Sequence, residues 1–132
     1  MITYHSTRGS KSTLSFQDIV LSGVAEDKGL YLPNGTTLEN LSNLTQEDLS
    51  YEDFVKTVFI ALDKNSASYV DELSIYPGFE NSPEPVLKEI NKDKYVMELF
   101  HGPTKSFKDY ALQPLGAIAV SYTHLRAHET EA

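Results

Sequence analysis

The chain contains no cysteine, and it contains no long uninterrupted apolar segment. Without cysteine it can form no disulfide and no thiolate nucleophile, and this composition fits a cytoplasmic protein. Its apolar runs stay well below the roughly 20 residues that a membrane-spanning helix needs, so no membrane span is expected. The first residues, Met1 to Tyr4, lack the basic region and apolar stretch of a signal peptide.

Positive charge is also scarce. The chain contains 11 lysines and arginines but 19 aspartates and glutamates, which gives a net charge of -8. No lysine or arginine cluster is present, so the electrostatic attraction that drives binding to nucleic acids or anionic membranes is missing. A length of 132 residues allows one domain with a sizeable core. The hydrophobic share of 40% and the charged share of 23% are ordinary for a globular protein.

Local patterns predict an α+β arrangement. Ser15 and Ser50 each precede an acidic residue three positions later, which is a helix N-cap pattern. Short strands are predicted at about 2–7 and at 30–32, the second ended by Pro33. Helical segments are predicted at about 16–22, 50–62 and 67–75, with a single helical turn at 86–90.

Residues 94–113 carry the most informative pattern. Residues 94–100 predict a buried strand, Gly102 and Pro103 predict a turn, and a helix is expected from Ser106. Lys108 then falls in the first helical turn, where the positive end of the helix dipole disfavours the ammonium form. Because carbonyl and Schiff-base chemistry requires a neutral amine, Lys108 is a candidate nucleophile.

The same helix should continue to about Val120, with two weak points. Pro114 removes the amide that would bond to the Tyr110 carbonyl, so a kink or an early end is expected there. Gly116 weakens the helix further.

Three segments, in order along the chain, resemble the threonine synthase family. Glu98–Gln113, ELFHGPTKSFKDYALQ, resembles the family's pyridoxal-phosphate attachment segment, whose pattern is close to LFHGPT-x-x-FKD. Tyr4–Gly9 resembles the amino-terminal YxSTRG, and the stretch from Ser15-Phe16 to Gly29–Pro33 resembles "SF…GGLYVP". The resemblance covers about residues 2–120.

The resemblance implies that Lys108 binds pyridoxal 5'-phosphate as a Schiff base in an enzyme that converts O-phosphohomoserine and water into threonine and phosphate. Lys105 is the competing lysine, but its place relative to Phe-Lys-Asp is wrong. The implied α/β fold is the tryptophan-synthase-β-like, type II pyridoxal-phosphate fold, with an amino-terminal domain at 1–92 and the start of the cofactor domain at 93–120. The family's glycine-rich phosphate loop and the residue facing the pyridine nitrogen are expected beyond this stretch, so the 132-residue polypeptide by itself should be inactive.

Other residues near these motifs allow two interpretations each. The hydroxyls of Thr104 and Ser106 could line the cofactor pocket or cap the helix, and capping is favoured. His101 could be an acid or a base, but a local hydrogen bond is favoured. Asp109 is expected to face the helix dipole. Arg8 could bind an anionic group of substrate or cofactor, or pair with a carboxylate.

The character of the sequence changes after Val120. The stretch SYTHLRAHET in residues 121–132 resembles translated sequencing adapter, so this segment is expected to be non-native. His124 and His128 stand four apart, as metal ligands on a helix can, but no third ligand is implied and no metal site is expected.

Two alternatives remain open, and so does the oligomeric state. The chain could come from another type II pyridoxal-phosphate lyase or dehydratase, although the STRG and HGPT motifs favour threonine synthase. It could instead be a small acidic interaction domain without catalysis, in which Lys108 is an ordinary surface residue.

Overall fold

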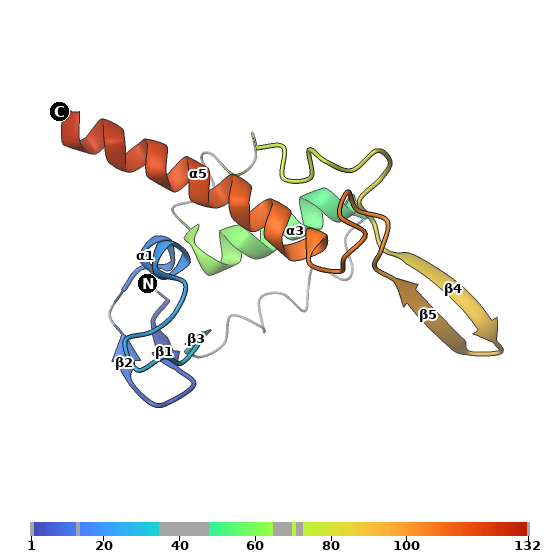
Figure 1. Cartoon of the computed structure of the whole chain (residues 1–132), viewed down its shortest axis with the longest axis horizontal. Helices are drawn as coiled ribbons and strands as arrows, with labels where there is room; N and C mark the ends of the chain where they lie inside the picture. Colours follow the sequence, from blue (N-terminus) through green and yellow to red (C-terminus); the bar gives the residue numbers. More distant parts are fainter. Residues whose placement is uncertain (1, 13, 35–47, 65–69, 71–72, 132) are drawn as a thin grey trace.

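The computed structural model describes residues 2–12, 14–34, 48–64, 70 and 73–131. Helices and small antiparallel sheets are mixed along the chain, which confirms the predicted α+β character (Figure 1). The elements are β1 (Tyr4–Ser6), β2 (Lys11–Ser12), α1 (Phe16–Ser22), β3 (Tyr31–Pro33), α3 (Tyr51–Leu62), β4 (Val86–Asn91), β5 (Lys94–Glu98) and α5 (Asp109–Glu131). Across the described residues, no helix combines the length and apolar character needed to cross a membrane.

The amino-terminal sheet has the strand order β2-β1-β3, and both pairings are antiparallel. Its last strand starts one residue later than predicted and includes Pro33, which pairs with Tyr4. Proline is tolerated there because β3 is an edge strand, where a missing amide does not break the ladder.

The predicted capping patterns of α1 and α3 are confirmed. The Ser15 side chain accepts a hydrogen bond from the Asp18 amide, and the Asp18 side chain completes the capping box. Gly23 ends α1 with a φ of 75°, a value at which glycine avoids the strain of a side chain. The Ser50 side chain likewise accepts a bond from the Asp53 amide at the start of α3.

Asp27 joins the loop after β1 to the loop before β3. Its carboxylate accepts hydrogen bonds from the buried Ser6 hydroxyl (2.6 Å), the Gly29 amide (2.9 Å) and the Ser10 amide (3.2 Å). These donors, the Ser6 hydroxyl first, lower the pKa of Asp27 to about 2. Gly29 is required by close approach, since a Cβ there would lie 1.9 Å from Ser6 Oγ.

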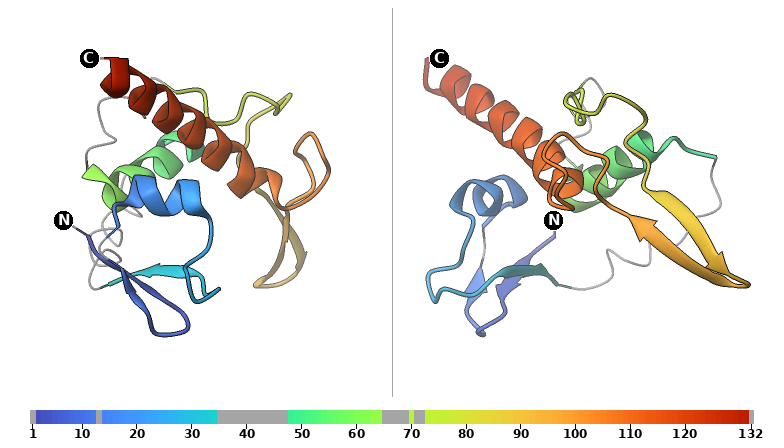
Figure 2. Two further views of the ribbon diagram at one scale, coloured as in Figure 1. Left: turned by 60° about the vertical axis from the view of Figure 1, so that its left-hand side comes forward. Right: turned by 45° about the vertical axis from the view of Figure 1, so that its right-hand side comes forward.

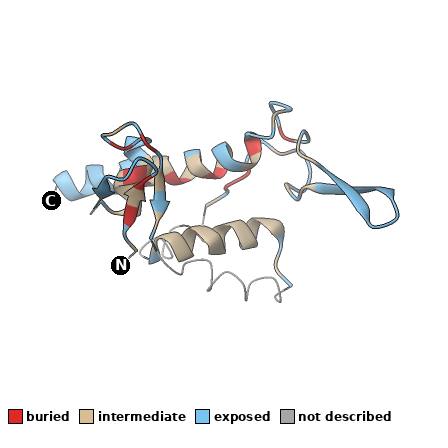
Figure 3. Ribbon diagram, turned by 90° about the horizontal axis from the view of Figure 1, so that it is seen from below, coloured by how far each residue is buried: buried red, intermediate tan, exposed pale blue. Residues whose placement is uncertain are grey.

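The hydrophobic core lies along α5, against which α1 packs. Its fully buried members are Val70, Ile118 and Tyr122. Five half-buried side chains pack around them: Phe16, Val20, Phe59, Ile60 and Leu73. Figure 3 shows the buried positions distributed along α5 and the amino-terminal sheet.

The segment 121–132 continues α5 as far as Glu131. Its Tyr122 belongs to the core, and Arg126 forms an ion pair with Asp18 of α1. The segment is therefore helical and partly buried, and its non-native origin stays a prediction.

Pro114 does not end α5, so the predicted early end is wrong, and Figure 1 shows no break in the helix. The Tyr110 carbonyl, which loses its helical amide partner because of Pro114, accepts a hydrogen bond from the Tyr76 hydroxyl at 2.8 Å. Burial raises the pKa of Tyr76, which keeps this donor protonated. The Gly78 amide also bonds to the Gln113 side chain at 3.3 Å, so the 76–78 segment supports the helix around the proline.

The β4–β5 hairpin departs most from the predictions. The helical turn expected at 86–90 is wrong, because these residues form β4, antiparallel to β5. The predicted strand at 94–100 is shorter and is not buried. The hairpin extends away from the other elements (Figure 2), and its side chains stay exposed, Leu87 to 60% and Met97 to 56%.

The helix predicted at 67–75 falls largely outside the described residues. Val70 is described as helical, whereas residues 73–75 are not, so the helix does not reach Ile75 as predicted. The Leu73 amide closes a turn onto the Val70 carbonyl at 3.1 Å.

The Tyr76 hydroxyl should contribute to stability in part because Pro114 leaves the Tyr110 carbonyl without an amide partner. Tyr76→Phe keeps the ring and removes the donor to the Tyr110 carbonyl, which should lower the free energy of unfolding by about 1–2 kcal/mol. In a Pro114→Ala background the new amide can bond to that carbonyl, so the same change should cost about 1 kcal/mol less. Urea unfolding of the four proteins of this double-mutant cycle measures the coupling.

Tyr4→Phe is the matched control for this cycle. The buried Tyr4 also donates to a backbone carbonyl, that of Leu62, at 3.0 Å. The cost of Tyr4→Phe should not depend on residue 114. Equal costs of Tyr76→Phe in both backgrounds would contradict the compensation of Pro114.

Asp27 should make the free energy of unfolding depend on pH in the acidic range. Its pKa in the folded chain, about 2, lies below the ordinary value of about 3.9. The carboxylate therefore contributes its full stability above about pH 4 and loses it as the pH falls toward 2. The stability difference between wild type and Asp27→Asn, from urea unfolding, should be larger at about pH 5 than at about pH 2.5.

Glu26→Gln removes the neighbouring exposed carboxylate and serves as the control. Its stability difference from wild type should change less between the two pH values. A constant difference for Asp27→Asn would show that the Asp27 bonds do not persist in solution.

Candidate functional site

The turn between β5 and α5 carries the candidate lysine. Helix α5 begins at Asp109 rather than at the predicted Ser106. The Lys108 carbonyl accepts the first i to i+4 bond, from the Leu112 amide at 2.7 Å, so Lys108 is at the N-cap and not inside the first turn. The three residues before Asp109 are held as a turn, because the Ser106 oxygens accept bonds from the amides of Lys108 (3.3 Å) and Asp109 (3.1 Å).

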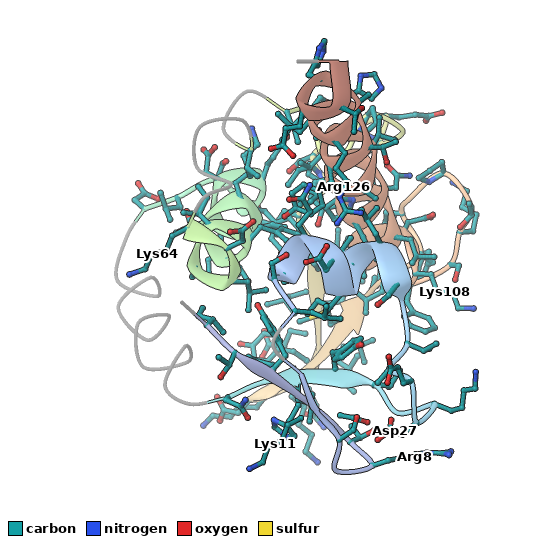
Figure 4. The ribbon with its side chains drawn as sticks, turned by 90° about the vertical axis from the view of Figure 1, so that its left-hand side faces the viewer. Arg8, Lys11, Asp27, Lys64, Lys108 and Arg126 are labelled. Carbon is teal, nitrogen blue, oxygen red and sulfur yellow. The ribbon has the colours of Figure 1, made fainter. Side chains whose placement is uncertain are left out.

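The Lys108 side chain is exposed and points away from the helix into solvent (Figure 4). In the described part of the chain, no carboxylate lies within ion-pair distance of its amine. Two other lysines differ in this respect, since the Lys56 amine lies 3.8 Å from Glu52 and the Lys88 amine 3.1 Å from Glu98. The Lys108 amine is therefore accessible to a carbonyl compound.

Asp109, next to this lysine, is a buried carboxylate with 5% exposure. Its Oδ2 accepts a hydrogen bond from the Thr104 amide at 2.9 Å, and its Oδ1 accepts one from the Thr104 hydroxyl at 2.7 Å. Gly102 packs against the same side chain, since a Cβ on Gly102 would lie 2.4 Å from Asp109 Oδ2. The carboxylate thus connects the turn to the start of α5, a role beyond the predicted orientation toward the helix dipole.

The two candidate hydroxyls differ in what they can still bind. The Thr104 hydroxyl already gives its proton to Asp109. The Ser106 hydroxyl accepts a bond from the Lys108 amide, and no acceptor for its own proton lies among the described residues. Ser106 is therefore the better donor to a ligand bound beside Lys108.

The first amides of α5 are not available for a phosphate. The amides of Asp109, Tyr110 and Ala111 donate to the carbonyls of residues 106, 107 and 108, at 3.1, 3.3 and 3.1 Å. A phosphate at a helix N-terminus needs such amides to be free. The described residues thus fit the aldehyde end of pyridoxal phosphate, through Lys108, and leave its phosphate to groups elsewhere.

His101 makes the local hydrogen bond that was predicted. Its Nε2 lies 2.6 Å from Glu98 Oε2, and Lys88 binds the other oxygen of the same carboxylate. These two partners, His101 first, lower the pKa of Glu98. The imidazole is therefore attached to the end of β5 next to the turn.

Arg8 and Lys108 are not brought together. Arg8 donates to the Asp27 backbone carbonyl at 3.3 Å. Of its two predicted partners, a carboxylate is not within ion-pair distance among the described residues, and binding of an anionic group stays a prediction. Figure 4 shows Arg8 and Asp27 at the loop beside β1, away from Lys108 at the start of α5. His124 and His128 lie exposed on α5, and the residues that the structure describes contain no group of three metal-ligating side chains.

Two structural carboxylates were not recognised from the sequence. Thr104 and Asp109 are five residues apart, and Ser6 and Asp27 are 21 apart, so neither pair has a helical or strand spacing. The available signal was the presence of glycines near both pairs, because Gly29 and Gly102 each lie where a Cβ would overlap a bonded side chain.

Comparison with known proteins finds the family that the sequence motifs resemble. The family "Threonine synthase N terminus" matches residues 3–69, just over half of the chain. Threonine synthase from Pseudomonas aeruginosa is 37% identical over 125 residues, which cover 87% of this chain and 26% of that protein. The Saccharomyces cerevisiae threonine synthase is 32% identical over 127 residues, covering 86% of this chain and 24% of that protein.

A solved structure is similar as well. The crystal structure of PLP-bound threonine synthase from Brucella melitensis matches with a TM-score of 0.76 and 30% identity, covering 96% of this chain and 28% of that one. The chain thus spans about a quarter of the length of the relatives it matches. On the family match over residues 3–69, the chain belongs to the threonine synthase family.

Proposed function

We propose that this chain is the amino-terminal part of a threonine synthase, a pyridoxal-phosphate-dependent lyase that converts O-phosphohomoserine and water into threonine and phosphate. The observation that carries the proposal is the accessible Lys108 amine within Phe-Lys-Asp, at the start of α5. The relatives named threonine synthase and the PLP-bound solved structure support the reaction and the cofactor.

Lys108 would hold the cofactor through a covalent bond between its amine and the cofactor aldehyde. When bound, pyridoxal phosphate supplies an electron sink for carbanion chemistry at the substrate. The Lys108 Nζ would also carry protons to and from the substrate carbons. Ser106 can donate a hydrogen bond to the bound group, whereas Thr104 and Asp109 shape the turn.

The division of the chain into 1–92, 93–120 and 121–132 remains part of the proposal. Its first boundary falls in the turn of the β4–β5 hairpin. The cytoplasmic location expected from the cysteine-free sequence stays a prediction.

The first test is covalent trapping of pyridoxal phosphate on the 132-residue chain. Incubation with the cofactor should produce an absorbance band near the visible edge. Borohydride reduction should abolish the band and leave a stable pyridoxyl group, which peptide mass spectrometry should find on Lys108 more than on Lys105. Both lysines are exposed, and the physical reason for the preference is that Lys108 directly precedes the N-terminus of α5, whereas Lys105 lies three residues earlier.

Lys108→Ala should remove the band, and Lys105→Ala, which removes an exposed lysine of the same turn, should retain it. A band that survives Lys108→Ala would count against the assignment of the lysine. It would favour the alternative in which Lys108 is an ordinary surface residue.

The second test concerns turnover. The chain by itself, with cofactor and O-phosphohomoserine, should release no more than a stoichiometric amount of phosphate, because no phosphate cradle lies at the start of α5. A chimaera in which residues 2–120 replace the matching quarter of the Pseudomonas aeruginosa threonine synthase should release phosphate catalytically. Lys108→Ala in this chimaera should lower the rate by roughly 100-fold or more. Turnover by the chain alone would disprove its predicted inactivity.

A further inference from the structure

We infer that Asp109 is a positioning residue whose buried carboxylate, bound by Thr104, fixes the backbone from which Lys108 projects. This inference rests on the proposed function, in which the Lys108 amine binds the cofactor. It assigns to Asp109 a task in addition to a favourable interaction with the helix dipole.

The first argument is the burial of the charge. Asp109 is 5% exposed, and burying a carboxylate is costly unless hydrogen bonds compensate for the lost water. Thr104 supplies both compensating donors, its amide at 2.9 Å and its hydroxyl at 2.7 Å. Hydrogen bonds to a charged acceptor are stronger than those between neutral groups, so this contact holds the turn against α5.

The second argument is the shape of the turn. A Cβ on Gly102 would lie 2.6 Å from the Asp109 Cβ, so turn and helix approach each other as closely as glycine permits. Lys105 within this turn has a φ of 60°, a left-handed conformation that is unfavourable for a residue with a side chain. The surrounding contacts must maintain such a conformation, and the Thr104–Asp109 bonds close the loop that contains it.

The third argument concerns the amine itself. Asp109 follows Lys108 directly, and a free carboxylate there could pair with the ammonium group and keep it from reacting. Both Asp109 oxygens instead bind Thr104, and the Lys108 side chain is exposed and points away from the helix into solvent. The same two bonds therefore fix the lysine backbone and keep the adjacent charge away from its amine.

The experiment measures which lysine reacts when substitutions weaken the hydrogen bonds between Thr104 and Asp109. The 132-residue chain and its variants are incubated with pyridoxal phosphate, reduced with borohydride and digested. Peptide mass spectrometry then gives the ratio of the pyridoxyl group on Lys108 to that on Lys105. Asp109→Ala should lower this ratio by roughly fivefold or more, because misplacement of a reacting group greatly lowers its rate.

Milder variants locate the effect in the hydrogen bonds. Asp109→Asn keeps a carbonyl acceptor, and Thr104→Val removes only the hydroxyl donor, so each should cause a smaller fall in the ratio. Thr104→Ser should restore a ratio close to that of wild type. Asp53→Asn is the matched control, because it neutralises a first-turn acidic residue in α3 and should leave the ratio unchanged.

The possible outcomes distinguish the proposed function of the chain from the positioning role of Asp109. Failure of the wild-type chain to label Lys108 above Lys105 would count against the proposed function. Preferential labelling that persists in Asp109→Ala, Asp109→Asn and Thr104→Val would overturn the positioning role. If circular dichroism shows that Asp109→Ala does not fold, the Asn and Val variants decide the question.

Discussion

The buried carboxylate of Asp109 is the constraint on which the candidate site depends. A charge with 5% exposure is stable only because Thr104 offers it two donors, so the turn and the start of α5 must form together. Gly102 is glycine because the same carboxylate occupies the space of a side chain. The exposed Lys108 lies directly beside this buried side chain in the sequence.

Helix α5 connects this turn to the rest of the chain. Near its start, the Tyr76 hydroxyl binds the carbonyl that Pro114 leaves without an amide. Further along, Ile118 and Tyr122 pack into the core that α1 also contacts. A helix held at its start, at its proline and in its core places the lysine relative to the amino-terminal sheet, which has its own support in the Ser6–Asp27 bond.

The predicted serine N-caps and the local bond of His101 were confirmed, whereas the predicted early end of α5 was not. The Ser15 and Ser50 caps satisfy amides three residues away, so the sequence contains all the required information. The same holds for His101, whose partner Glu98 is three residues back. The early end at Pro114 was wrong because the compensating hydroxyl comes from a residue 38 positions earlier, Tyr76.

The sequence by itself determined the family, the candidate lysine and most helix starts, because ordered motifs and capping residues are local patterns. Only the tertiary structure decided that β4 is a strand and that the β4–β5 hairpin is exposed, since strand pairing depends on a partner that residues 86–90 do not reveal. It also decided how Asp109 is used. The spacing of Thr104 and Asp109 has no regular period, so their contact exists only once the turn has folded back onto α5.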